Sequence, residues 1–166
     1  MPAAAEVLRW SIILLLSILL VIASVSDIRH RKIPNWSVLA IGVLFVPWAF
    51  FASPVSVLSS LGAALIALVI GLGLYAFRIV GAGDSKLLAV VALFAGMEHL
   101  LQLLVLVALA GGVIALISLV ARPTRAMVML HMRGKGDFGR GIPYGVAIAI
   151  ATVCIVALPL PKNLLI

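Results

Sequence analysis

Long apolar runs with few charges limit this chain more than any other feature of its sequence. The runs lie at about 8–26, 36–52, 55–77, 86–98, 100–120 and 142–160. A stretch of about 17–25 apolar residues can cross the hydrocarbon core of a bilayer as a helix. Hydrophobic residues make up 65% of the 166 residues and charged residues only 10%, more apolar surface than a soluble domain of this size can bury. We therefore expect a single membrane-embedded domain over residues 1–166, an all-α polytopic integral membrane protein with six transmembrane helices.

The same composition excludes a soluble globular protein, a disordered chain and a secreted disulfide scaffold. Cys154 is the single cysteine of the sequence, so it can form no internal disulfide and no multi-cysteine metal site. The fourth and fifth runs adjoin, and residues 87–120 as one straight helix would exceed a hydrocarbon core of about 30 Å even when tilted. We therefore predict a break at Met-Glu-His, residues 97–99.

The basic residues predict the orientation of the spans. Net charge is +7, and with six spans the connections at 27–35, 78–86 and 121–141 share one side and carry ten of the twelve Lys and Arg residues. With five spans the same residues divide six to six. Because positive residues gather in cytoplasmic loops, the count favours six helices with both termini periplasmic, and it explains the positive charge without nucleic acid. The first run also has features of a signal peptide, but it is as long as a span.

Two of the acidic residues stand at predicted cytoplasmic ends of helices. Asp27 follows the first run directly, and Asp84 lies in Gly-Ala-Gly-Asp-Ser-Lys-Leu-Leu at 81–88. Two carboxylates that share a site repel each other, so one holds a proton while the other is ionised. Such a pair can activate water for attack on a peptide carbonyl and protonate the leaving amine, as in aspartic proteases. Alternatively, Asp27 pairs with a nearby arginine or lysine and only ends a helix.

Three segments together resemble the type IV prepilin peptidases, membrane aspartic proteases of the Gly-x-Gly-Asp type. They are Asp27 with Ile-Pro-Asn at 33–35, the segment at 81–88, and Gly-Ile-Pro-Tyr-Gly at 141–145, in the order of the family. The resemblance implies that Asp27 and Asp84 are the catalytic pair. It also implies a prepilin substrate, whose short basic leader is removed, usually after a glycine, at the cytoplasmic face of the bacterial inner membrane.

Larger members of that family carry a cytoplasmic cysteine-rich segment and also N-methylate the new pilin N-terminus. A single cysteine cannot supply such a segment. The chain is therefore similar to the short, peptidase-only branch that serves tight-adherence (Flp-type) pili, and we expect no methyltransferase domain.

Further residues are expected to support the two acids. Gly81 and Gly83 give the backbone freedom ahead of Asp84, which we expect to lie on a mobile segment. Lys86 has two open interpretations. It is either a cation that tunes the acid pair or holds substrate backbone, or a positive anchor at the membrane surface.

Residues at two helix starts complete the expected site. Pro34 suits the start of the second span, and Asn35 is a hydrogen-bonding residue at that start. By resemblance, Pro143 and Tyr144 open the last helix, where Tyr144 either lines the site or packs. We expect no cofactor and no metal ion, because the acids activate water themselves.

A second Gly-x-Gly-Asp occurs at 134–137, in a glycine- and arginine-rich stretch without the following Lys-Leu-Leu. Asp137 is therefore predicted to be a solvated loop residue, and the alternative is a role in binding a basic leader. Two other functions stay open. One is a small proton-coupled transporter that relays protons through intramembrane acids. The other is a non-catalytic scaffold subunit of a secretion complex.

Overall fold

The computed structural model describes residues 2–30, 32–52, 57–121 and 144–158, and regular structure within these ranges is entirely helical. The all-α prediction is confirmed for these residues. The elements are α1 (Pro2–His30), α2 (Asn35–Pro47), a π-helix η1 (Trp48–Ala52), α3 (Val57–Ala76), α4 (Ala82–Ala121) and α6 (Tyr144–Ala157).

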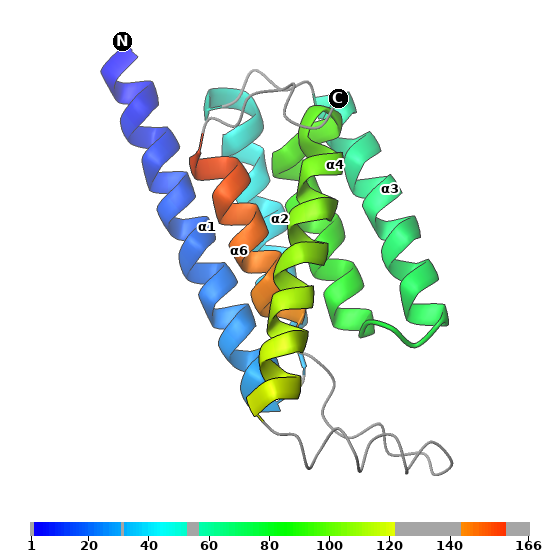
Figure 1. Cartoon of the computed structure of the whole chain (residues 1–166). Helices are drawn as coiled ribbons and strands as arrows, with labels where there is room; N and C mark the ends of the chain where they lie inside the picture. Colours follow the sequence, from blue (N-terminus) through cyan, green and yellow to red (C-terminus); the bar gives the residue numbers. More distant parts are fainter. Residues whose placement is uncertain (1, 31, 53–56, 122–143, 159–166) are drawn as a thin grey trace.

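The helices pack side by side as a bundle (Figure 1). α3 lies along α4, α4 contacts α6, and α1 contacts both α6 and α2. α1 and α3 end, and α4 and α6 begin, at the lower end of the bundle in Figure 1. Segments that are distant in the sequence therefore meet at this lower end.

Two helices extend beyond the apolar runs that predicted them. α1 continues to His30, whereas the first run stops at 26, and α4 begins at Ala82 rather than at 86. Helical hydrogen bonds form as well in polar turns as in apolar ones, so hydropathy underestimates helix length. Asp27 and Asp84 consequently lie inside helices rather than in the connections beside them.

α4 reverses its direction at Gly96. This residue has φ 63° and ψ −179°, a conformation that is essentially restricted to glycine. Figure 1 shows residues 82–95 running away from the lower end and residues 97–121 returning to it. The amide of Met97 donates to Ser59 Oγ of α3 at 3.1 Å, which satisfies a backbone group near the break. The break lies one residue before the predicted segment 97–99, because the glycine and not the polar pair permits the reversal.

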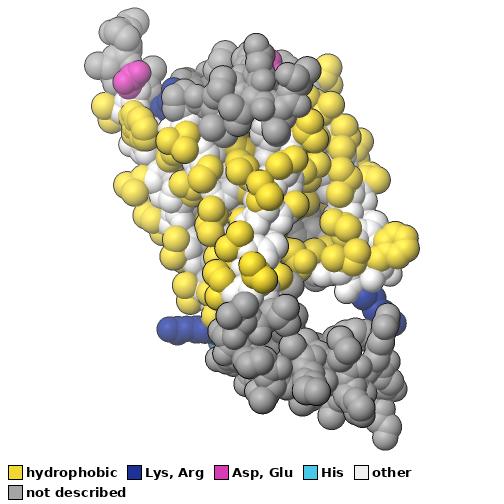
Figure 2. Space-filling view, in the orientation of Figure 1, with side chains coloured by type: hydrophobic (Ala, Val, Ile, Leu, Met, Phe, Trp, Pro, Cys, Tyr) yellow, Lys and Arg dark blue, Asp and Glu magenta, His cyan; other side chains and the backbone are white. Residues whose placement is uncertain are grey.

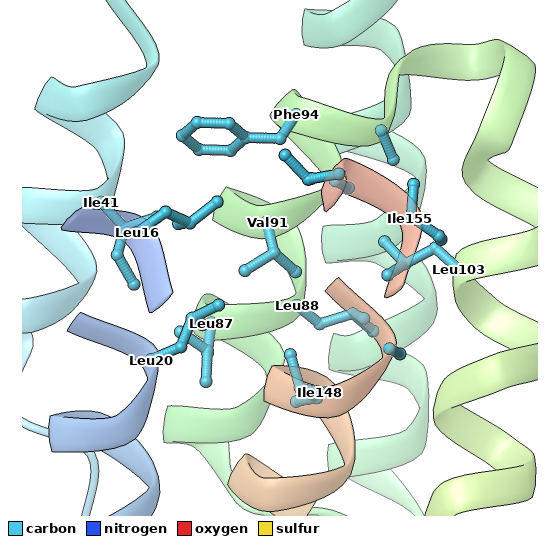
Figure 3. Close-up of a cluster of buried hydrophobic side chains, with 14 of the residues drawn as sticks. Leu16, Leu20, Ile41, Leu87, Leu88, Val91, Phe94, Leu103, Ile148 and Ile155 are labelled. Atoms are coloured by element: carbon cyan, nitrogen blue, oxygen red, sulfur yellow. The ribbon is translucent and has the colours of Figure 1, made fainter. Parts of the chain in front are cut away.

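The core lies midway along the bundle, where branched aliphatic side chains pack with the aromatic rings of Phe45, Trp48 and Phe94 and with alanines (Figure 3). Its largest fully buried members are Leu16, Leu20, Ile41, Leu87, Leu103 and Ile148. The exterior is apolar as well, with Leu14, Leu39, Leu65 and Leu116 all at least 60% exposed. Figure 2 shows hydrophobic side chains over the middle of the visible face and charged side chains towards its two ends.

Three described stretches are long and apolar enough to cross a bilayer, namely Glu6–His30, Val57–Ala76 and Ala82–Ile117. Asn35–Phe50 and Tyr144–Ala157 are apolar but shorter. An apolar exterior on such helices is the property of a membrane protein, because lipid solvates those side chains. The number of spans and the side on which the termini lie stay predictions.

Candidate active site

Asp27 lies near the end of α1 and faces the start of α6. Its side chain is 7% exposed, and its Oδ2 accepts a hydrogen bond from the amide of Gly145 at 3.1 Å. Gly145 is the second residue of α6. Amides in the first turn have no partner within their own helix, and the positive end of the helix dipole favours a negative charge there. The position is therefore suited to a buried, ionised carboxylate.

Ser24 strengthens the contact between α1 and α6. It lies one turn before Asp27, and its Oγ donates to the carbonyl oxygen of Gly145 at 3.2 Å. Both polar backbone atoms of Gly145 are thus bonded to α1. A Cβ at position 145 would lie 3.0 Å from Oδ2 of Asp27, closer than ordinary contact, so a side chain here would crowd the carboxylate.

Asp84 lies in the first turn of α4, where it accepts a hydrogen bond from the chain just before it. Its Oδ2 is 3.1 Å from the amide of Gly81, and Ser85 N–H donates to the carbonyl oxygen of Gly81. Gly81 is therefore the N-cap, and Asp84 at the third helical position makes one half of a capping box. This contact alone would also suit a carboxylate that only stabilises the helix start.

Ser85 fixes the start of α4 against α3. Its side chain is 1% exposed, and its Oγ lies 2.8 Å from the carbonyl oxygen of Gly71 and 3.3 Å from that of Gly81. A Cβ at Gly71 would lie 2.9 Å from Cβ of Ser85, so the two helix backbones approach closely at this point. The helix turn that carries Asp84 is therefore anchored on α3.

The connection between α1 and α2 packs against the first turn of α4. A Cβ on Gly83 would lie 3.2 Å from Cβ of Ile33, and Lys86 Nζ donates to Asn35 Oδ1 at 3.3 Å. The segment that follows Asp27 is thus in contact with the helix that carries Asp84. Gly83 permits a close approach here, whereas the sequence suggested that it supplies backbone freedom.

Pro34 and Asn35 form the start of α2. Pro34 is the N-cap residue, with φ −64° and ψ 133°, and Asn35 is the first helical residue. The carbonyl oxygen of Pro34 accepts hydrogen bonds from Ser37, from its amide at 3.1 Å and from its Oγ at 2.8 Å. Proline has no amide to leave unsatisfied, which suits this position.

Tyr144 is the first residue of α6, and its ring lies against α4. A Cβ at Gly111 would lie 3.0 Å from Cε1 of Tyr144, so the ring packs on the returning part of α4.

Pro143 and Asp137 fall outside the described residues. Within the described part of the chain, no group of three or more His, Cys, Asp and Glu side chains could hold a metal ion.

The sequence brings Asp27 and Asp84 to one end of the bundle, but it did not identify the groups that bind them. Those groups are the amides of Gly145 and Gly81. The hydroxyls of Ser24 and Ser85 hold the backbone nearby, at the carbonyl oxygens of Gly145 and Gly71. Ser24 gave a weak signal, because a residue three positions before Asp27 shares its helix face. The glycine partner on a distant helix had no signal in the spacing.

Comparison with known proteins places this arrangement in a family. The family model described as the type IV leader peptidase family matches residues 14–116, more than half of the chain and a range that includes both aspartates. No curated protein and no solved structure matches the chain. The chain therefore belongs to the type IV leader peptidase family.

Proposed function

We propose that this member of the type IV leader peptidase family is an aspartic endopeptidase with Asp27 and Asp84 as its catalytic pair. Family membership implies a peptidase with a prepilin substrate. One observation supports the aspartic assignment. Asp27 at the end of α1 and Asp84 at the start of α4 lie at the same end of the bundle, each with Oδ2 on a backbone amide of a helix start.

The proposed reaction uses the two carboxyl groups in different protonation states. The ionised carboxylate takes a proton from a bound water, whose oxygen attacks the carbonyl carbon of the scissile peptide bond. The protonated carboxyl group donates to the developing oxyanion. When the tetrahedral intermediate collapses, the C–N bond breaks, the leaving amine takes the proton that the first carboxylate had removed from water, and a hydroxyl proton of the intermediate returns to the second carboxylate. A new carboxyl and a new amino terminus result, and both aspartates regain their starting protonation states.

The proposed substrate is a prepilin of the tight-adherence (Flp-type) pilus, and the proposed place is the cytoplasmic face of the bacterial inner membrane. The charge count supports this face, because the sequence segments 27–35, 78–86 and 121–141 carry ten of the twelve basic residues, and the first two of them include Asp27 and Asp84. Acids at one end of the bundle suit a basic leader that stays outside the hydrocarbon core. A proton carrier would instead need its acids near the middle of the membrane.

The decisive experiment is cleavage of a co-expressed prepilin by Asp27→Asn and Asp84→Asn variants. Asparagine keeps a side-chain oxygen that can accept the hydrogen bonds from Gly145 and Gly81. It can neither act as a base for water nor donate an acidic proton. A purely structural aspartate therefore tolerates the change, whereas a catalytic one does not.

We expect both variants to insert into the membrane and to leave the prepilin uncut. Asp137→Asn and Glu98→Gln are the matched controls, since each removes a carboxylate outside the proposed pair, and both should cleave normally. Normal cleavage by either Asp27→Asn or Asp84→Asn would refute the proposed function.

A further inference from the structure

The two aspartates are each held by a glycine amide, with a serine hydroxyl beside it. In each case the amide donates to Oδ2 of the aspartate at 3.1 Å, Gly145 to Asp27 and Gly81 to Asp84. Ser24 Oγ donates to the carbonyl oxygen of Gly145 at 3.2 Å, and Ser85 Oγ donates to the carbonyl oxygen of Gly71 at 2.8 Å, with that of Gly81 at 3.3 Å. These two sets come from different helices and share no residue.

A side chain at either glycine would crowd the aspartate. A Cβ would lie 3.0 Å from Oδ2 of Asp27 at position 145 and 3.1 Å from Oδ2 of Asp84 at position 81. A side chain at either position would therefore require the carboxylate or the helix start to shift by a few tenths of an ångström. Glycine also has the widest range of backbone conformations, so a hydrogen bond from another residue restricts its backbone more than that of any other residue.

Ser24 and Ser85 each have a hydrogen bond to another helix, unlike Ser11 and Ser17. Ser11 and Ser17 donate to the carbonyl oxygen four residues earlier in α1, both at 2.8 Å, as helical serines commonly do. Ser24 of the same helix donates to α6 instead. Ser85 has its shortest contact with Gly71 of α3. Their hydroxyls therefore join helices at the two places where the aspartates lie.

We propose that Ser24 and Ser85 are positioning residues: Ser24 holds the Gly145 backbone that orients Asp27, and Ser85 holds the helix turn that carries Asp84 against Gly71 of α3. This inference rests on the proposed peptidase function and adds to it the groups that set the geometry of the pair. Neither serine acts on the substrate. Each fixes one backbone segment, and a small displacement of a reacting group lowers the rate of the chemical step more than it weakens substrate binding.

The test measures kcat and KM separately on the full chain in detergent micelles. The probe is a synthetic peptide with a basic leader, a glycine before the cut and an apolar stem. Ser24→Ala and Ser85→Ala should each lower kcat about tenfold while KM and the unfolding temperature stay close to those of the unchanged protein. Ser24→Thr keeps the hydroxyl and should restore kcat.

Two matched controls separate positioning from general packing. Ser17→Ala removes a hydroxyl from α1 that bonds only within its helix, and it should leave kcat unchanged. Ser60→Ala removes a buried hydroxyl, 1% exposed, whose Oγ has no hydrogen-bond partner among the described residues, and it should also leave kcat unchanged. Ser24→Cys keeps the size of the side chain with a weaker donor, so it serves if the alanine variant does not fold.

The outcomes distinguish this inference from the proposed function. Unchanged kcat in Ser24→Ala and Ser85→Ala, with inactive Asp27→Asn, overturns the positioning role alone. An equal loss in the Ser17→Ala and Ser60→Ala controls also overturns it, because the effect is then one of packing. Full cleavage by Asp27→Asn instead overturns the peptidase mechanism on which the inference rests.

Discussion

The amide of Gly145 donates to Oδ2 of Asp27 at 3.1 Å and thereby joins two residues that are 118 positions apart in the chain. Asp27 belongs to α1, but its orientation depends on how α6 packs beside α1. The family match ends at residue 116, before α6 begins. The last helix therefore contributes to the candidate site although neither aspartate lies on it.

Replacing Gly145 by alanine should lower cleavage strongly. The new Cβ would lie 3.0 Å from Oδ2 of Asp27, so either the carboxylate or the start of α6 must move. We expect kcat to fall by about tenfold or more, because the reacting group is displaced. Gly112→Ala and Gly73→Ala are the controls, since an added Cβ meets nothing within 4 Å at either position. Loss of activity in those controls would show that any helical glycine is sensitive.

Removal of both aspartates should cost little more than removal of one. Groups that act as a unit give non-additive effects, since loss of the first already stops the chemistry. The residual cleavage rate of the Asp27→Asn, Asp84→Asn double variant should therefore be close to that of either single variant. Multiplied losses would mean that the two acids act independently.

Cleavage should survive treatment of the protein with a metal chelator, because the acids are proposed to activate water themselves. A loss of cleavage that added zinc restores would contradict this proposal.

A variant at Gly83 can separate close packing from backbone freedom. A Cβ at this position would lie 3.2 Å from Cβ of Ile33, so Gly83→Val should reduce cleavage while the protein stays folded and inserted. The smaller change Gly83→Ala separates the two causes. If the contact is the cause, a Gly83→Ala protein should regain cleavage when Ile33→Ala is added. If a hinge before Asp84 is the cause, Ile33→Ala should restore nothing. Full activity of Gly83→Val would exclude both explanations without affecting the catalytic pair.

Hydropathy predicted the helical fold because the apolar runs are long and the charges between them are few. It placed Asp27 and Asp84 in connections, yet both lie within helices, since helical hydrogen bonds continue past the apolar run. The break in α4 was predicted from length and assigned to the polar residues at 97–99. The structure places it at Gly96, whose φ of 63° is a conformational property that hydropathy does not measure.

Charge counting and motif order predicted that the two aspartates lie at the same end of the spans, and the ends of the helices that carry them agree; the catalytic role and the membrane face stay predictions. The groups that orient them were not predictable. A hydrogen bond such as that from Ser24 to Gly145 depends on the rotation and depth of two packed helices. Sequence spacing fixes which residues share a helix face, but it does not fix the partner on another helix.

The orientation of the spans can be measured directly. Six helices with periplasmic termini predict that a reporter fused after Pro54 or at the C-terminus lies outside, and that one fused after Thr124 lies inside. The reason is the excess of basic residues in the connections at 27–35, 78–86 and 121–141. Paired enzyme reporters, one active in each compartment, provide the measurement. A cytoplasmic C-terminus would contradict the six-span arrangement.

Gly96 should be the glycine whose replacement most lowers the stability of the bundle. Its φ of 63° with ψ of −179° lies in a region that only glycine adopts readily, so a side chain there costs about 1–3 kcal/mol. Asparagine should not rescue it, because the left-handed conformation that asparagine tolerates has ψ near +45°. We therefore expect Gly96→Ala and Gly96→Asn to unfold at similar, lower temperatures in detergent. Gly112→Ala, in the same helix with open space around it, should unfold no earlier than the unchanged protein. A Gly96→Ala protein with an unchanged unfolding temperature would show that the reversal of α4 does not depend on glycine.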